Sequence, residues 1–250
     1  MTGIEVDLFD VPTLFGGSLY FDVAENPTAL EIWREWTLTV PEEVTSAVAV
    51  LPFPDIPPVP APLRGKYIAQ VQFAILGDGG EDLIKPLRAI GRPALDTVGE
   101  LPHPESGKIF AEPERPDSYS SRNVLLSELD RDALATLPKL AGPHAQAMCV
   151  IGIRHLGGAL TQPADNAVGH RDAAYSLTVL SPGERDVTEL HRTVLDPWSA
   201  FVVGRFLNFT FGPLTPDEVR EAYEPDAWNR LTELRARYDA DRRLVANHQL

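Results

Sequence analysis

The chain has 250 residues, 44% of them hydrophobic, and 36 acidic against 22 basic residues give it a formal net charge of −14. This composition excludes a disordered or fibrous chain, and the acidic balance argues against binding to a nucleic-acid backbone, which requires a phosphate-neutralising surface. The longest apolar runs, such as residues 47–51, are too short to span a bilayer, so we expect no membrane segment and a cytoplasmic protein.

The first residues predict a strand at the very start of the chain. Apolar and polar residues alternate over residues 3–9, as they do in a half-buried strand. Gly16-Gly17 breaks this pattern, and residues 18–23 predict a second strand. Asn26 and Pro27 then predict an N-cap and a first-turn proline for the helix that follows.

The following residues predict an α+β fold. Strands are predicted at 45–51, 66–76, 123–126, 147–154 and 173–180, and helices at 29–36, 81–90, 130–140 and 184–202. Because the strands arrive largely in pairs separated by helices, we expect a largely antiparallel sheet with helices covering one face. Two stretches are predicted to be loops, a proline-rich one at 52–62 and a polar, aperiodic one at 99–123.

The character of the sequence changes after residue 203. Residues 204–212 are aromatic and irregular, and two short helices are predicted at 215–223 and 225–238, which gives a C-terminal helical segment. In the second helix an apolar stripe at three- and four-residue steps predicts packing against the core, through Trp228, Leu231, Leu234 and Tyr238.

The sequence lacks the standard catalytic signatures. No glycine-rich phosphate loop stands between a strand and a helix, no G-x-S-x-G turn is present, and the six histidines lack metal-ligand spacing, so we predict no metal site. Cys149, the one cysteine, lies in an apolar stretch and is predicted to be a small buried hydrophobe rather than a nucleophile.

Polar residues gather around a Gly-Gly pair between two predicted strands. Polar residues beside a sharp backbone turn can form the floor of a pocket, and the candidates are Arg154, His155, Gln162, His170, Arg171 and Tyr175. The residues alone favour a simpler alternative. In that alternative, Arg154 and His155 would lie on opposite faces of one strand, and His170 and Arg171 would begin the next strand.

At the C-terminus the sequence resembles the berberine-bridge-enzyme-like FAD-linked oxidoreductases. The resemblance rests on the closing motif of that family, matched by residues 206–209, Ala222-Tyr223, Arg230-Leu231, Tyr238-Asp239 and Asn247. Residues 63–102 and 153–160, followed by His170-Arg171, resemble the substrate domain of bacterial members. The resemblance therefore spans essentially the whole chain.

The resemblance implies an FAD-dependent oxidoreductase that positions a small organic substrate over the flavin for hydride transfer. It divides the chain into three parts. Residues 1–17 would be a junction strand from an FAD-binding domain that is absent. Residues 18–203 would form the substrate domain, and residues 204–250 the C-terminal segment. FAD would be held mainly by the absent domain, so we expect the chain alone to be inactive and to pair with a separate FAD-binding chain or a second copy. The alternative is a detached, non-catalytic module that binds a ligand or a partner.

The resemblance also assigns site residues. Gln162 and His155 are the catalytic candidates, and the neutral amide of Gln162 would orient the substrate because it cannot abstract a proton. His155 could act as a base near neutral pH, although a structural histidine explains it equally well. Arg154, Tyr175 and Phe206 are predicted to bind the substrate, and Asn208 and Asn247 to contact the cofactor.

Two departures from the family pattern affect these assignments. Ala240 stands where a proline is usual, and both aromatic positions around Asn208 are phenylalanine. Members that use a tyrosine there as a base have a hydroxyl that this chain lacks, which removes one candidate base.

Overall fold

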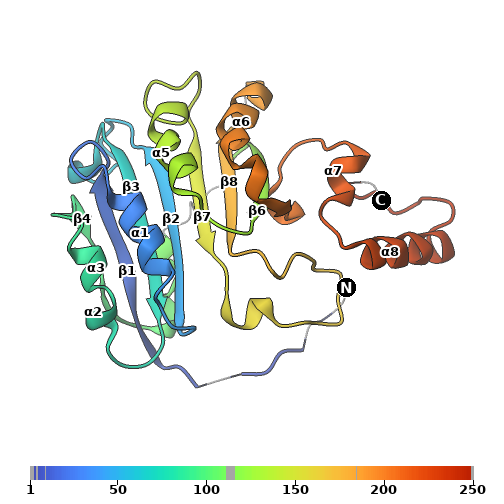
Figure 1. The fold of residues 1–250 in the computed structure, drawn as a ribbon, viewed down its shortest axis with the longest axis horizontal. Coiled ribbons are helices and arrows are strands. Elements are labelled where there is room, and N and C mark those ends of the chain that lie inside the picture. Colours follow the sequence, from blue (N-terminus) through green and yellow to red (C-terminus); the bar gives the residue numbers. More distant parts are fainter. Residues whose placement is uncertain (1–2, 4, 9, 111–115, 184, 249–250) are drawn as a thin grey trace.

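The computed structural model describes residues 3, 5–8, 10–110, 116–183 and 185–248, and it confirms the α+β fold (Figure 1). The described strands form one antiparallel sheet in the order β4-β1-β3-β2-β7-β8-β6-β9, and β5 also pairs with β1. The strands are β1 (Thr13–Asp22), β2 (Val44–Pro52), β3 (Tyr67–Ile75), β4 (Leu95–Asp96), β5 (Gly99–Pro102), β6 (Tyr119–Leu126), β7 (Val150–His155), β8 (Tyr175–Pro182) and β9 (Val202–Gly204). The helices are α1 (Ala29–Thr37), α2 (Gly80–Leu83), α3 (Lys85–Arg88), α4 (Gly107–Phe110), α5 (Arg131–Leu140), α6 (Thr188–Leu195), α7 (Pro216–Arg220) and α8 (Pro225–Tyr238).

Helices α1, α5 and α6 pack on one face of the sheet, where the main core lies (Figure 1). In α1 the buried residues are spaced three or four apart, which places Trp33 and Trp36 on the side that meets the sheet. The Trp33 indole Nε1–H donates to Ser46 Oγ at 2.9 Å, so its polar atom is satisfied inside the core. Alternate strand residues, such as Val71 and Phe73 of β3, complete the layer.

The start of α1 differs from the prediction. The residue before the helix is Thr28, which makes no side-chain cap, and Asn26 is buried two residues earlier. The Asn26 Nδ2 donates to the Asp22 carbonyl at 3.2 Å, and a Cβ on Gly91 would lie 2.2 Å from the Asn26 Oδ1. Asn26 therefore holds the turn after β1 and is not available as the N-cap.

The predicted strand over residues 3–9 is wrong for the residues described. Gly3, residues 5–8 and Asp10 form no strand and are exposed, and Ile4 and Phe9 lie outside the described residues. The first strand, β1, instead runs straight through Gly16-Gly17. A Cβ on Gly17 would lie 2.6 Å from the Thr97 carbonyl oxygen, and one on Gly16 would lie 2.6 Å from that of Phe73. These glycines allow neighbouring backbone to approach and do not end the strand.

Two other stretches also differ from the prediction. The predicted loop at 99–123 contains β5, α4 and the start of β6, because β5 gains its hydrogen bonds from β1, far away in the sequence. The predicted helix at 184–202 is shorter, since α6 ends at Leu195 and a 3-10 helix, Asp196–Phe201, follows with Pro197 in its first turn.

The C-terminal segment is helical as predicted, with α7 and α8 beside the sheet (Figure 1). Helix α8 has no buried residue. Trp228, Leu231 and Leu234 are half-buried and Tyr238 is 73% exposed, so the predicted packing of this helix against the core is wrong. Polar contacts instead attach the segment. Arg205 pairs with Glu218 and Glu221 of the α7 region, and the ring of His170 bonds the Glu221 carbonyl and approaches Glu224. No helix among the described residues is long and apolar enough to cross a bilayer.

Candidate functional site on the polar face of the sheet

Two neighbouring rows of side chains cross the sheet on the face opposite to α1, α5 and α6. The first row is formed by Ser18, Gln72, Ala47, Arg154, Ser176 and Leu125, each the partner of the next across β1, β3, β2, β7, β8 and β6. The second row is formed in the same way by Tyr20, Gln70, Ala49, Gly152, Thr178 and Asn123. We call the two rows the polar face, because they hold amides, hydroxyls and one guanidinium, with no carboxylate.

Helix α4 covers the β1 and β3 end of the polar face. The Ser18 Oγ donates to the Ile109 carbonyl at 2.8 Å, and the Gln72 Nε2 donates to the Phe110 carbonyl at 3.3 Å. The Gln70 Nε2 donates to Ser18 Oγ at 3.1 Å and to Tyr20 OH at 3.0 Å. These bonds fix the two glutamine side chains in place.

The 3-10 helix Leu207–Phe209 (η5) covers the other end, at β6. Asn123 organises this end: its Nδ2 donates to Ser176 Oγ and Thr178 Oγ1, both at 2.9 Å, and its Oδ1 accepts from the Phe206 backbone N–H at 2.8 Å. Because Asn123 is fully buried and both ends of its amide are bonded, it fixes the position of the aromatic segment over the sheet.

The centre of the polar face is built from the smallest side chains. Ala47, Ala49 and Gly152 lie side by side on β2 and β7. The nearest atom to a Cβ placed on Gly152 would be Arg154 Nη1, at 3.9 Å, and Ala49 and Gly152 both remain partly exposed. A flat molecule could therefore lie on this floor, between the amides of β3 and the Arg154 guanidinium.

Arg154 is the one charged group of the polar face. Its guanidinium carbon lies 4.3 Å from the centroid of the Phe209 ring, a cation–π arrangement. Six other half-buried arginines each donate at least one hydrogen bond, whereas Arg154 forms neither a hydrogen bond nor an ion pair with another described residue. Its N–H groups therefore remain available to a ligand.

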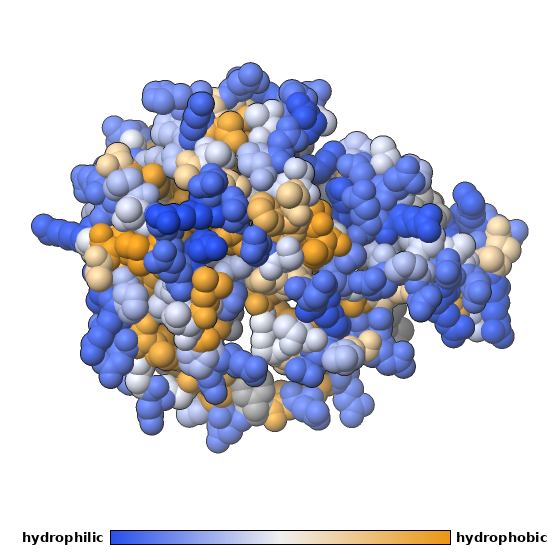
Figure 2. Space-filling model, viewed as in Figure 1, coloured by the Kyte–Doolittle hydropathy of each residue, from blue (hydrophilic) through white to orange (hydrophobic). Residues whose placement is uncertain are grey.

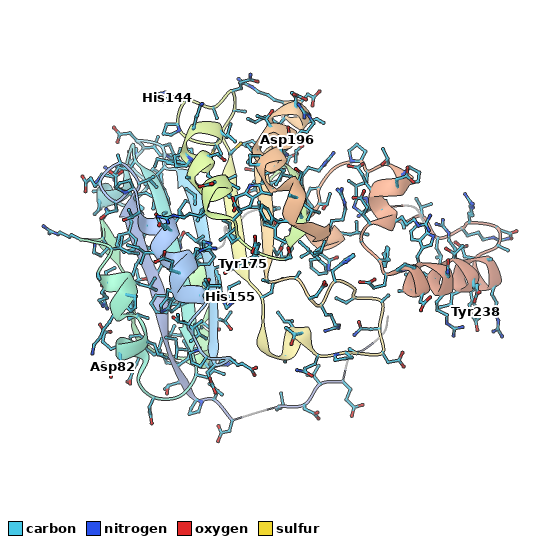
Figure 3. All side chains as sticks on the ribbon, in the orientation of Figure 1. Asp82, His144, His155, Tyr175, Asp196 and Tyr238 are labelled. Carbon is cyan, nitrogen blue, oxygen red and sulfur yellow. The ribbon has the colours of Figure 1, made fainter. Side chains whose placement is uncertain are left out.

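His155 and Tyr175, predicted to share the site with Arg154, lie on the other face of the sheet (Figure 3). The two rings are 5.5 Å apart, and the Tyr175 hydroxyl is 2.7 Å from Thr37 Oγ1 inside the helix-side core. Burial lowers the pKa of His155 and raises that of Tyr175. The simpler alternative, with Arg154 and His155 on opposite faces of one strand, is the arrangement observed.

The other predicted residues are distributed around the polar face. Phe206 lies beside it, with its ring 5.6 Å from that of Phe209. Asn208 belongs to η5 and is exposed, and Asn247 is exposed in the C-terminal tail. Gln162 is exposed just after a short 3-10 helix, Gly158–Thr161, and is not in either row.

Sequence reasoning missed Gln70, Gln72 and Asn123. A signal was present, because Gln70 and Gln72 recur with period two inside an otherwise apolar strand and so mark one polar face. The signal for the small-residue floor is weaker, since Ala47, Ala49 and Gly152 come together only through the pairing of β2 with β7.

A second concavity, of about 640 Å³, lies between α8 and the loop before β8. It is lined by apolar and charged residues of both segments, including Val168, Arg171, Asp226, Arg230 and Leu234. The described residues include no group of three or more His, Cys, Asp or Glu side chains placed to hold a metal ion.

Among curated proteins, the chain is similar to an FAD-linked oxidoreductase of Dictyostelium discoideum. The two are 20% identical over 253 residues, which cover 96% of this chain and 52% of the relative. The chain thus spans about half the length of the curated relative it matches. No protein-family model matches the sequence.

Solved structures with this fold include berberine bridge enzyme and proteins named as similar to it. A berberine-bridge-enzyme-like protein from Arabidopsis thaliana superposes with a TM-score of 0.69 at 15% identity, covering 94% of this chain and 56% of that one. Berberine bridge enzyme from Eschscholzia californica superposes with a TM-score of 0.67 at 12% identity, covering 92% of this chain and 53% of the enzyme. 6-Hydroxy-D-nicotine oxidase from Arthrobacter nicotinovorans superposes with a TM-score of 0.64 at 17% identity, covering 92% of this chain and 53% of the oxidase.

Proposed function

Since the resemblance to the berberine-bridge-enzyme-like FAD-linked oxidoreductases is confirmed at the level of the fold, we propose that this chain is the substrate-binding part of an FAD-dependent oxidoreductase. In this proposal the polar face covers the flavin and holds a small organic substrate. The observation that carries the proposal is the open, small-residue centre of that face between α4 and η5, which suits a flat ring.

The residues of the polar face fit the ring end of FAD. Ala49 and Gly152 offer a flat surface, and Gln70 and Thr178 flank them with groups that can hydrogen-bond. The fit does not extend to the phosphates, because the glycine-rich turn before α2, at residues 77–80, lacks the glycine spacing of a dinucleotide-binding loop. We propose that an FAD-binding domain, in the same polypeptide or on a separate chain, holds that end, and that the exposed Asn208 and Asn247 contact it.

When bound, FAD supplies the acceptor for a hydride. The chain itself contributes binding and orientation. The amides of Gln70 and Gln72 are fixed by hydrogen bonds, Arg154 offers free N–H donors, and Phe206 and Phe209 form an apolar wall. His155 and Tyr175 act as packing residues in this proposal, because their side chains lie beneath the sheet.

Lumiflavin, the isolated flavin ring, tests this proposal on the chain itself. We expect saturable quenching of lumiflavin fluorescence, and we expect Ala49→Trp to abolish it because the indole fills the floor. A matched control is Ala89→Trp, since Ala89 is an exposed alanine at the end of α3. Equal quenching by both variants would place the flavin elsewhere, and absence of quenching by the native chain would contradict the proposal. A non-catalytic module, the alternative, would bind ligands on this face without binding lumiflavin.

A further inference from the structure

Arg154 differs from six other half-buried arginines in having no polar partner within the described residues. Arg88, for example, is bonded to Glu81 and Asp96, and Arg205 to Glu221. A guanidinium partly withdrawn from water loses hydration, and here no described residue replaces it with a hydrogen bond. The stacked ring of Phe209 compensates for lost hydration on one face of the guanidinium. The N–H edge of the guanidinium has no described partner.

The surroundings of Arg154 favour a ligand with a single negative charge. Neither row of the polar face contains a carboxylate, so the guanidinium is a local positive charge in a chain of net charge −14. The polar face holds no second cation, and its remaining polar groups are uncharged. A monoanion balances Arg154, whereas a phosphate dianion would bring an uncompensated charge.

The shape of the site also indicates the kind of anion. The Arg154 Nη1 lies 3.9 Å from the position of a Cβ on Gly152 and is the nearest described atom to it, so the guanidinium borders the space above the small-residue floor. A planar carboxylate at this edge can accept two parallel N–H bonds from a guanidinium. The body of the same molecule would then rest on Ala47 and Ala49.

We propose that Arg154 is the specificity residue of this site and that it binds the carboxylate of a small organic acid, whose uncharged body lies over Ala47, Ala49 and Gly152. The inference rests on the proposed function only in treating this acid as the substrate. Its binding geometry requires the chain alone.

Benzoate and benzamide form the test, since they share a planar body and differ in charge. Binding to the full chain is measured by heteronuclear NMR, through the amide signals of Gly152 and Arg154. We expect benzoate to bind at least ~10-fold more tightly than benzamide, the ratio typical of a charge-assisted hydrogen bond. Arg154→Gln should abolish this preference, and Arg92→Gln, at an exposed arginine, should preserve it.

A second variant separates the charge from the space. Gly152 has no positive φ and lies in a strand, so Gly152→Val suits the backbone and fills the floor while the chain retains Arg154. We expect it to weaken benzoate and benzamide alike. Equal affinity of the native chain for both ligands, a retained preference in Arg154→Gln, tighter binding of inorganic phosphate, or no binding at all would overturn the inference. The assay contains no flavin, so its outcome is independent of the lumiflavin result.

Discussion

His191 is a buried residue whose charged form the fold disfavours. Its Nε2 lies 2.9 Å from Ser181 Oγ, which in turn lies 3.6 Å from Cys149 Sγ, and all three residues are buried. Burial, with a smaller contribution from the charge of Arg122, lowers the pKa of His191 from 6.5 to about 4. Cys149 is buried as predicted, and burial raises the pKa of its thiol, which argues against a nucleophilic role.

This lowered pKa predicts a pH-dependent stability. The unfolded chain binds a proton at His191 near pH 6.5 and the folded chain near pH 4, so the stabilisation is complete above pH 6.5 and is lost as the pH falls toward 4. We expect the free energy of unfolding, from urea titrations, to fall more steeply over this range in the native chain than in His191→Gln. His144→Gln, at an exposed histidine, is the control. Parallel pH profiles for the native chain and His191→Gln would refute the prediction.

At the scale of single elements, α5 and α8 form a natural comparison, because each carries two leucines three residues apart. Leu134 and Leu137 of α5 are fully buried, whereas Leu231 and Leu234 of α8 are half-buried. We expect Leu137→Ala to lower the free energy of unfolding by about 2–5 kcal/mol, the usual cost of a core cavity. Leu234→Ala should cost under ~1 kcal/mol, since few contacts are lost. Chemical denaturation measures both, and a similar loss in the two variants would show that α8 is part of the core.

The same contrast shows what sequence patterns can and cannot predict. The stripes of α1 and α8 look alike in the sequence, yet the first meets the sheet and the second meets an adjacent loop. The core strands β2, β3, β7 and β8 were predictable because each has its own apolar alternation. The pairing of β5 with β1 depends on residues more than eighty positions apart, which local patterns do not contain.

The site was predictable only where local sequence motifs identify its residues. Arg154 and Phe206 were identified from motifs, and the structure places them at one end of the polar face. His155 and Tyr175 were grouped with Arg154 by nearness in the sequence, but adjacent strand residues point to opposite faces. Two rows that cross six strands follow only from the complete strand order.

The whole molecule has two different faces. In the view from the helix side, hydrophilic residues surround scattered apolar ones, and the surface over α8 is largely hydrophilic (Figure 2). The opposite face carries the half-buried rings of Phe206 and Phe209 and, beside them, Phe211, which is 43% exposed. Aromatic residues grouped around an open polar floor are typical of a surface that a ligand or a second domain covers.

If an FAD-binding domain covers the polar face, it should protect these aromatic rings from solvent. Hydroxyl-radical footprinting of the chain, alone and joined to such a domain with FAD bound, measures this directly. We expect oxidation of Phe209 and Phe211 to fall several-fold in the FAD-loaded protein, because the Phe209 ring stacks on Arg154 beside the floor that the flavin would occupy and the exposed Phe211 follows it along β6. Leu38, 65% exposed just after α1 on the helix side, should be oxidised equally in both states. Protection of Leu38 with unchanged oxidation of Phe209 would mean that the FAD-binding domain docks on the helix layer and that the polar face has another ligand.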